Sequence, residues 1–216
     1  MRKQTIPASH IPNHAEEKAL YSAGYRRVAG LDEAGRGALA GPVVAAAVVL
    51  PPKPDFRWLP MVRDSKLLSH KVRENIFTCM QDCGLEIGVG IVAPAVIDKV
   101  NILNATRQAM LMALANLVQP PDYLLIDAVT LPGLSIQQKG IIQGDRTVIS
   151  IACASVVAKV TRDRIMLELD ARYPRYKFCR HKGYGTPEHM ACLRSYGASQ
   201  VHRFTYAPVR DLAKFI

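Results

Sequence analysis

Short apolar runs alternate with longer segments of helical periodicity along most of this chain. Each short run is rich in β-branched or other apolar residues and is bounded by glycine, proline or a polar cluster, which is typical of buried strands. The predicted strands are 26–31, 43–50, 85–92, 123–126 and 140–143.

Three longer segments predict helices. Ser69 is a good N-cap for a helix over 70–83, and Gly84 follows that helix. Residues 104–118 carry apolar side chains at helical spacing before two prolines, and residues 150–171 form a third helix that ends before Pro174. The last helix begins "SIACASVVAK", and these small residues would let a backbone pass close to it.

Strands and helices in this order predict an α/β domain around a mostly buried sheet. The part of the chain from Arg172 onward is basic and helical, and is expected to form a small C-terminal region.

Composition and charge narrow the class of partner. Hydrophobic residues make up 49% of the 216 residues and charged residues 21%, as in an ordinary globular protein. The formal net charge of +10 favours a polyanion, either nucleic acid or an anionic membrane surface. The longest apolar run, 43–50, is far shorter than the ~20 residues of a membrane span, and residues 1–13 lack the apolar core of a secretion signal. No membrane partner is therefore expected.

Five cysteines cannot all pair with one another, and none forms a Cys-x-x-Cys or lies at zinc-ligand spacing from a histidine. Reduced thiols and a cytoplasmic location are expected.

Three of the predicted strands lead into carboxylates. "VAGLDE" delivers Asp32 and Glu33, "YLLIDA" delivers Asp127, and "GIIQGD" delivers Asp145. An ionised carboxylate at the end of a buried strand is costly unless it is paired or bound to a metal. Four such groups at one sheet edge would repel one another and need cations between them. Ligands that are all oxygen suit Mg²⁺ or Mn²⁺.

Asp32 and Glu33 are adjacent, and adjacent residues of a regular strand point to opposite faces. The two can share a site only if the strand breaks at this point, and Gly35 and Gly37 are expected to supply that break. The alternative is structural, because acids commonly end strands and cap helices. For Asp127 alone this alternative is the stronger one, whereas the acid pair beside a glycine–arginine loop favours function.

A basic segment provides candidate contacts for a polyanion. "RYPRYKFCRHK", residues 172–182, holds five Lys or Arg residues with Tyr173, Tyr176 and Phe178 between them, and Tyr184 follows. Basic groups neutralise phosphates and aromatic rings stack on bases or sugars. The alternative is a solvated helix end whose aromatic residues pack in a core.

Other catalytic patterns are absent from the sequence. It has no phosphate-binding loop of the Gly-x-x-x-x-Gly-Lys type and no Gly-x-Ser-x-Gly, and "GRGALAG" does not fit a dinucleotide fingerprint. His181, His189 and His202 lack metal-ligand spacing, so surface or supporting roles are expected for them.

The stretch "GLDEAGRGALAGPVV" resembles the type 2 ribonucleases H, specifically bacterial ribonuclease HII. Further motifs agree in order and spacing over roughly residues 28–208. They are "DSKLLS", "NILNATRQAM", "LLIDA", "GDRTVISIACASVVAKVTRD" and "HKGYGTPEH".

The resemblance implies a ribonuclease H-like mixed sheet flanked by helices. It divides the chain into an N-terminal extension (1–27), a catalytic domain (28–171) and a basic helical region (172–216) that completes the substrate groove. It also implies Mg²⁺- or Mn²⁺-dependent cleavage of RNA in RNA–DNA hybrids and cutting 5′ of single ribonucleotides in duplex DNA, leaving 3′-hydroxyl and 5′-phosphate ends. A contact with a replication clamp cannot be tested from the sequence.

The resemblance also assigns roles. It makes Asp32, Glu33, Asp127 and Asp145 the catalytic, metal-binding carboxylates. Gly35, Arg36 and Gly37 would sense the ribose 2′-hydroxyl, largely through backbone groups. Tyr184 would stack on a sugar at the junction, and Ser65 and Lys66 would lie near the substrate backbone.

The chain departs from the family pattern at Ala38, where proline is usual, at Leu67, where a second lysine is usual, and at Cys153, where alanine is common. Ala38 predicts a less stiff loop, Leu67 puts one contact with the substrate backbone in doubt, and no functional consequence is expected of Cys153. None of the three departures affects the carboxylates. A ribonuclease HIII-type enzyme would fit the same acids, but typically has lysine at the position of Arg36 and a long N-terminal extension. A catalytically silent nucleic-acid-binding module is the other alternative.

Overall fold

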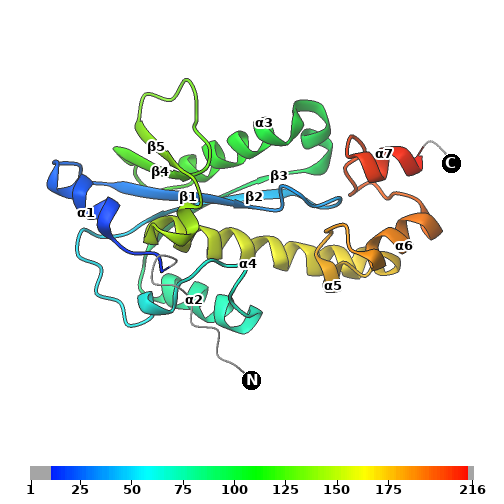
Figure 1. Ribbon diagram of the computed structural model, residues 1–216, viewed down its shortest axis with the longest axis horizontal. Helices are drawn as coiled ribbons and strands as arrows, with labels where there is room; N and C mark the ends of the chain where they lie inside the picture. Colours follow the sequence, from blue (N-terminus) through cyan, green and yellow to red (C-terminus); the bar gives the residue numbers. More distant parts are fainter. Residues whose placement is uncertain (1–10, 214–216) are drawn as a thin grey trace.

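The computed structural model describes residues 11–213. At its centre is a five-stranded sheet in the order β3-β2-β1-β4-β5 (Figure 1). The strands are β1 (Val28–Ala34), β2 (Val43–Val49), β3 (Glu86–Val92), β4 (Tyr123–Asp127) and β5 (Gln137–Ile141). β1, β2 and β3 pair antiparallel, whereas β4 and β5 run parallel to β1. The predicted mixed sheet flanked by helices is confirmed.

The helices lie between and after the strands. They are α1 (Ala15–Ser22), α2 (His70–Asp82), α3 (Pro94–Ala115), α4 (Ile149–Arg172), α5 (Phe178–His181), α6 (Pro187–Tyr196) and α7 (Ala207–Ala213). Short 3₁₀ turns are η2 (Leu59–Met61), η3 (Gly144–Arg146) and η4 (Pro174–Tyr176).

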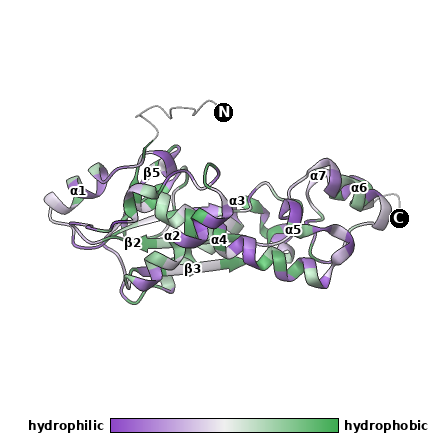
Figure 2. Ribbon diagram, turned by 90° about the horizontal axis from the view of Figure 1, so that it is seen from below, coloured by the Kyte–Doolittle hydropathy of each residue, from purple (hydrophilic) through white to green (hydrophobic). Residues whose placement is uncertain are grey.

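The sheet is covered on both faces. α3 packs on one face, while α4, with α2 outside it, packs on the other (Figure 1). β2 shows the alternation clearly, because Ala45 and Ala47 contact the α3 side whereas Ala46 and Val48 contact the α4 side. Hydrophobic residues gather around the sheet in the middle of the molecule (Figure 2).

α4 approaches the sheet very closely. A Cβ added to Gly30 of β1 would lie 2.3 Å from the carbonyl carbon of Ser150, so only glycine fits at this contact. The small residues at the start of α4 therefore lie against β1, as the sequence indicated. This contact fixes the position of α4 relative to the end of β1.

Most predicted elements are confirmed with shifted boundaries. Ser69 caps α2 through a hydrogen bond from Val72 N to its hydroxyl, as expected. The segment predicted as a helix over 104–118 begins already at Pro94, and the helix is kinked at Asn101, whose φ is 66°. Because the kink interrupts the helical spacing of the apolar residues, the sequence pattern did not reveal the part of α3 before residue 104. β5 lies earlier than 140–143 because Gln143 adopts a left-handed turn conformation with φ 55°.

Apolar residues of the basic C-terminal region pack with Leu39, Ala40 and Met166 of α4 in a hydrophobic cluster beyond the carboxyl end of β1 (Figure 1). Tyr176 and Phe178 are buried in this cluster, and Tyr173 packs at its edge. The prediction that these rings interleave with the basic residues to bind nucleic acid is therefore wrong for Tyr176 and Phe178, because rings in a core cannot reach a base. The core-packing alternative is correct for both.

Segments near the N-terminus also pack on the sheet. Leu20 and Tyr21 of α1, with Tyr25, contact a cluster that includes Val28 and Leu125. The predicted division into 1–27, 28–171 and 172–216 stays a prediction, and residues 1–10 lie outside the described part. Within residues 11–213, no helix is both long enough and apolar enough to cross a membrane.

Candidate active site

Three of the four predicted acids line one cavity of about 510 Å³ at the carboxyl ends of β1 and β4. Asp32 and Glu33 come from β1 and Asp127 from the end of β4. Asp145, in η3, is buried beside this group and contacts Lys66, which also lines the cavity. Acids from three distant parts of the sequence thus meet at one edge.

β1 does not break at Asp32 and Glu33, so the expectation of a break at the acid pair is wrong. β1 continues to Ala34, with Asp32 opposite Ala46 and Glu33 opposite Ala45 of β2. Pairing with β4 stops earlier, at Leu31. Beyond that residue, no strand within residues 11–213 pairs with β1 on its β4 side, so side chains from both faces can reach the cavity there.

Burial and mutual repulsion perturb these acids. Burial raises the pKa of Asp32 well above its ordinary value, and the charges of Glu33 and Asp127 raise it further. Burial also raises the pKa of Glu33, although Arg36 opposes this shift. The pKa of Asp127 is raised by burial, with a smaller contribution from Asp145 and opposition from the hydrogen bond of Gly144. The cluster therefore favours an added positive charge.

Asp127, Glu33 and Asp145 each have a local partner. Gly144 N donates to Asp127 Oδ1 at 2.7 Å, Arg36 Nη1 lies 3.4 Å from Glu33 Oε1, and Lys66 Nζ lies 3.5 Å from Asp145 Oδ2. Within residues 11–213, no group of three His, Cys, Asp or Glu side chains is arranged to hold a metal ion. A bound cation would take over carboxylate oxygens that now face Arg36 and Lys66.

The donor set fits a hard divalent cation. The ligand atoms on offer are carboxylate oxygens, which Mg²⁺ and Mn²⁺ prefer. Glu33 Oε2 is buried and makes no hydrogen bond with the described residues. A buried carboxylate oxygen without a partner is costly, and a cation would satisfy it.

The loop that carries Ser65 and Lys66 is fixed by hydrogen bonds and an ion pair with buried groups. Asp64 is buried, accepts a hydrogen bond from Lys66 N at 3.0 Å and pairs with Arg146 at 3.1 Å. Ser65 Oγ lies 2.9 Å from Ser155 Oγ of α4. Burial alone would lower the pKa of Lys66, but Asp145 and Asp64 outweigh it and raise that pKa. Lys66 therefore stays charged at the cavity mouth.

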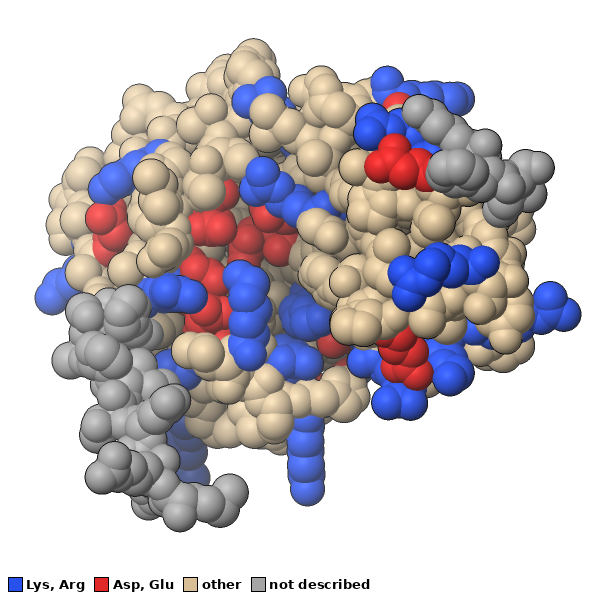
Figure 3. Space-filling model, turned by 45° about the vertical axis from the view of Figure 1, so that its right-hand side comes forward, with Lys and Arg blue, Asp and Glu red and all other residues tan. Residues whose placement is uncertain are grey.

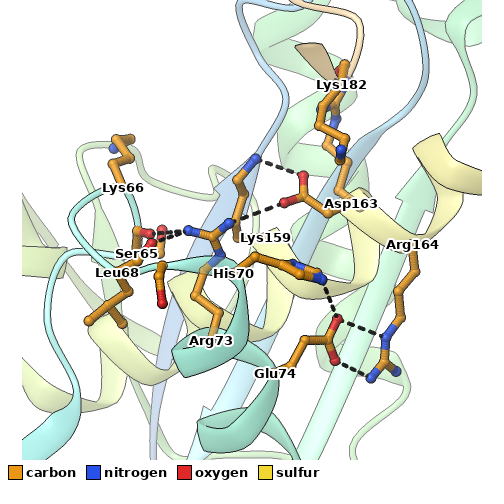
Figure 4. A network of polar contacts seen from close by, with 12 residues as sticks. Ser65, Lys66, Leu68, His70, Arg73, Glu74, Lys159, Asp163, Arg164 and Lys182 are labelled. Atoms are coloured by element: carbon orange, nitrogen blue, oxygen red, sulfur yellow. Dashed lines mark hydrogen bonds and ion pairs between the residues drawn. The ribbon is translucent and has the colours of Figure 1, made fainter. Parts of the chain in front are cut away.

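A second network braces this loop against α4 (Figure 4). Arg73 Nη1 donates to the carbonyls of Ser65 and Leu68 at 2.9 and 2.5 Å, and Arg73 Nη2 lies 3.4 Å from Asp163 Oδ2. Lys159 Nζ donates to Asp163 Oδ1 at 2.7 Å. Arg73, Lys159 and Lys66 all line the cavity, and together they form its cationic wall.

Tyr184 is 36% exposed and lines the cavity on the side of the C-terminal region. Lys159 Nζ lies 5.8 Å and the Arg162 guanidinium carbon 5.3 Å from the centre of its ring. An exposed ring held by two cations is available for stacking. The Gly35–Gly37 loop lines the same cavity.

The three histidines are buried beneath Tyr184, so the surface role considered for them is wrong and the supporting role fits. His189 Nδ1 lies 3.0 Å from the carbonyl oxygen of Tyr184 and must donate to it. His189 Nε2 must then accept from His202 Nε2, 3.1 Å away. Burial lowers the pKa of His189 and of His202 to about 4, which keeps both rings neutral at pH 7.

The structure adds cavity residues that the sequence did not single out. They are Arg73, Ser155 and Lys159. Ser155, Lys159 and Arg162 recur on α4 at helical spacing within "SVVAKVTR", which was a usable signal. Arg73 has no comparable pattern.

Acidic side chains gather in a hollow on one face of the molecule, with lysine and arginine around it (Figure 3). The basic residues of the 172–182 segment are exposed, except for the half-buried Lys182. Lys177 and Arg180 both pair with Glu188, which reduces their availability for phosphates.

Solved structures with the same architecture define the class of this protein. The crystal structure of the ribonuclease H2 from Pyrococcus horikoshii OT3 aligns with a TM-score of 0.71 and 28% identity, covering 88% of this chain and 98% of that one. Bst-RNase HIII in complex with Mn²⁺ aligns with a TM-score of 0.65 over 91% of this chain and 72% of that one, and its 17% identity supports the fold alone. The protein is a hydrolase of the type 2 ribonuclease H class.

The sequence comparisons identify the family within that class. The family model for ribonuclease HII matches residues 29–209. A curated ribonuclease HII from Dehalococcoides mccartyi is 49% identical over 207 residues, which cover 96% of this chain and 98% of that protein. The chain belongs to the ribonuclease HII family.

Proposed function

We propose that this protein is a metal-dependent endonuclease that hydrolyses the RNA strand of RNA–DNA hybrids and cuts 5′ of single ribonucleotides in duplex DNA. The products would carry 3′-hydroxyl and 5′-phosphate ends. One observation carries the proposal: a single cavity joins an acid cluster with raised pKa values to the Gly35–Gly37 loop and to exposed Tyr184. Family membership supports the same reaction class.

Asp32, Glu33, Asp127 and Asp145 would hold Mn²⁺ or Mg²⁺. Divalent cations bound by carboxylates activate water and neutralise charge on a phosphodiester and its leaving oxygen. The unpartnered Glu33 Oε2 and the raised carboxylate pKa values support this assignment. Bst-RNase HIII was solved in complex with Mn²⁺, and a metal site in that enzyme agrees with the cation proposed for this one.

The Gly35–Gly37 loop would recognise the ribose. Among the hydrogen bonds of residues 11–213, none uses the main-chain N–H of Gly35, Arg36 or Gly37. Three consecutive free N–H groups at a cavity wall can meet a hydroxyl and the phosphate beside it. The 2′-hydroxyl distinguishes RNA from DNA at a given nucleotide.

The cationic wall would hold the substrate backbone. Ser65, Lys66 and Lys159 face the cavity from the loop and from α4, where they can contact phosphates. Tyr184 would stack on the sugar at the junction. Leu67 is 60% exposed, so the lysine that is usual at this position would also have reached solvent. Ala38 is buried, and its N–H donates to Gly35 O at 3.3 Å. Any change in loop stiffness at Ala38 stays a prediction.

A nicking assay tests the proposal. It uses three duplexes of one sequence: all DNA, DNA with one ribonucleotide, and an RNA–DNA hybrid, each with Mg²⁺, Mn²⁺ or EDTA. Cleavage 5′ of the ribonucleotide with either metal and none with EDTA is expected. Binding without cleavage under either metal would leave the silent nucleic-acid-binding module as the function. A cytoplasmic location stays a prediction.

A further inference from the structure

Two arginines are completely buried next to the ribose-sensing loop. Arg162 of α4 and Arg203, which precedes α7, have no exposed surface. Neither takes part in an ion pair within residues 11–213. Burial lowers the pKa of Arg162 to about 10, so its guanidinium remains charged at pH 7. A buried charge without a carboxylate is expensive and needs many hydrogen bonds to offset its desolvation.

Arg203 directs its guanidinium at main-chain carbonyls of the loop. Its Nη1 donates to Arg36 O at 2.8 Å, and its Nε and Nη2 donate to Gly41 O at 3.1 and 3.0 Å. The Tyr206 hydroxyl donates to the same Arg36 carbonyl at 2.7 Å. Two donors thus fix the direction of this one peptide group.

Arg162 holds the rest of the loop and ties it to the turn before Tyr184. Its Nη2 donates to Ala40 O at 3.0 Å and its Nε to Pro42 O at 2.9 Å. Its third contact is from Nη1 to Lys182 O at 3.0 Å. One side chain therefore bridges two segments, each of which contributes nearby residues, Gly35–Gly37 and Tyr184, to the cavity.

The carbonyl contacts determine where the N–H groups point. In a planar trans peptide, the carbonyl of Arg36 and the N–H of Gly37 point in opposite directions. Since Arg203 and Tyr206 bind that carbonyl, the Gly37 N–H is directed away from them. Gly35, with φ 96°, lies directly over Arg162, since a Cβ there would be 2.0 Å from Arg162 Nε.

We propose that Arg162 and Arg203 are positioning residues. They would hold the Gly35–Pro42 loop and the turn before Tyr184 in a fixed relative position, and thereby set the preference for a ribose 2′-hydroxyl. This inference rests on the proposed function of the cavity. Hydrogen-bonding sites for a hydroxyl lose selectivity when their donors move, because the contact depends on direction as well as distance.

The test compares Arg162→Lys, Arg203→Lys and Tyr206→Phe with Arg107→Lys as a matched control. Arg107 also donates to a main-chain carbonyl, that of Thr130, but it lies outside the cavity. Lysine keeps the charge of each arginine and loses the planar fork of donors. The dissociation constants for two duplexes that differ by one ribonucleotide are measured with Ca²⁺ in place of Mg²⁺, and cleavage of the same pair is measured with Mg²⁺.

The two lysine variants are expected to lower the preference for the ribonucleotide duplex by about tenfold or more, with affinity for all-DNA duplex within about twofold of wild type. Tyr206→Phe, which removes one hydroxyl and no charge, is expected to lower the preference a few-fold, and Arg107→Lys should leave it unchanged. A purely structural role would lower stability and all affinities together.

An unchanged preference in both lysine variants would overturn the inference while leaving the proposed function intact. If thermal melts show that the lysine variants do not fold, Tyr206→Phe decides, and an unchanged preference in that variant overturns the inference. A wild-type protein that neither cuts nor prefers the ribonucleotide duplex would instead overturn the proposed function itself.

Discussion

At the end of β4, Asp127 lines the cavity and accepts a hydrogen bond from Gly144 N. Asp127→Asn keeps the size of this side chain and removes its charge, so it weakens cation binding without altering the cationic wall. Turnover is expected to fall by at least about a hundredfold, while affinity for the duplex is retained. Single-turnover cleavage and binding assays measure the two quantities separately.

Asp122→Asn is the matched control, because Asp122 lies at the opposite end of β4 and receives hydrogen bonds from Arg26 N and Arg27 N. It should retain turnover at any temperature at which it is folded. Wild-type rates for Asp127→Asn would exclude Asp127 from the reaction.

The raised pKa of Asp32 has a consequence for stability. Without metal, the folded state keeps a proton that the unfolded state releases, so stability falls as pH rises from the ordinary carboxyl pKa through the raised one. Asp32→Asn removes this cost. In EDTA at pH 8 the variant is expected to melt at least about 2 °C above wild type, which corresponds to roughly 1 kcal/mol.

The difference in melting temperature should shrink at pH 5, and Mn²⁺ should raise the melting temperature of wild type more than that of the variant. Calorimetry at both pH values checks this. A variant that melts below wild type in EDTA would show that Asp32 is stabilised by partners other than a cation.

The Tyr184 ring is partly exposed next to Lys159 and Arg162, as its proposed stacking on the substrate requires. Tyr184→Ala is expected to lower cleavage at an isolated ribonucleotide about tenfold and general DNA affinity much less. Tyr184→Phe keeps the ring and should remain close to wild type. Equal losses of cleavage and DNA affinity in the alanine variant would identify Tyr184 as a packing residue.

At the scale of elements, periodicity predicted the central strands and α2 well, because their buried faces repeat regularly. It missed the start of α3, where Asn101 adopts a positive φ. It also misplaced the end of β1, because pairing with β2 keeps the strand extended through Asp32 and Glu33. That pairing is a tertiary effect that no local pattern records.

The acids of the site could be predicted because each follows an apolar run. The contacts of the groups that support them could not, although the spacing of Ser155, Lys159 and Arg162 on α4 was a usable signal. Lys159 and Arg162 sit within a helix whose other residues are mostly buried, and Arg203 lies in an irregular segment more than 160 positions from the loop it contacts. Their roles depend on contacts between segments that only the fold brings together.

For the whole molecule, the net charge of +10 predicts salt-dependent binding of nucleic acid. Arg175, exposed in the 172–182 segment, is expected to contribute one phosphate contact. Arg175→Gln should reduce the slope of log affinity against log salt by about 1, whereas Lys53→Gln, in the loop after β2, should not change it. Titrations between about 50 and 200 mM salt measure the slopes. Equal slopes in the two variants would remove Arg175 from the interface.

The length of α4 sets a scale for the substrate. Its 24 residues begin directly after the turn that carries Asp145 and end at Arg172, a span of about 36 Å. Double-stranded nucleic acid rises about 3.4 Å per base pair, so this span corresponds to about ten base pairs, or one helical repeat. On the proposed function, a duplex that lay along α4 would need about one helical repeat to contact the acids and Arg172 together, and cleavage is expected to weaken for shorter duplexes.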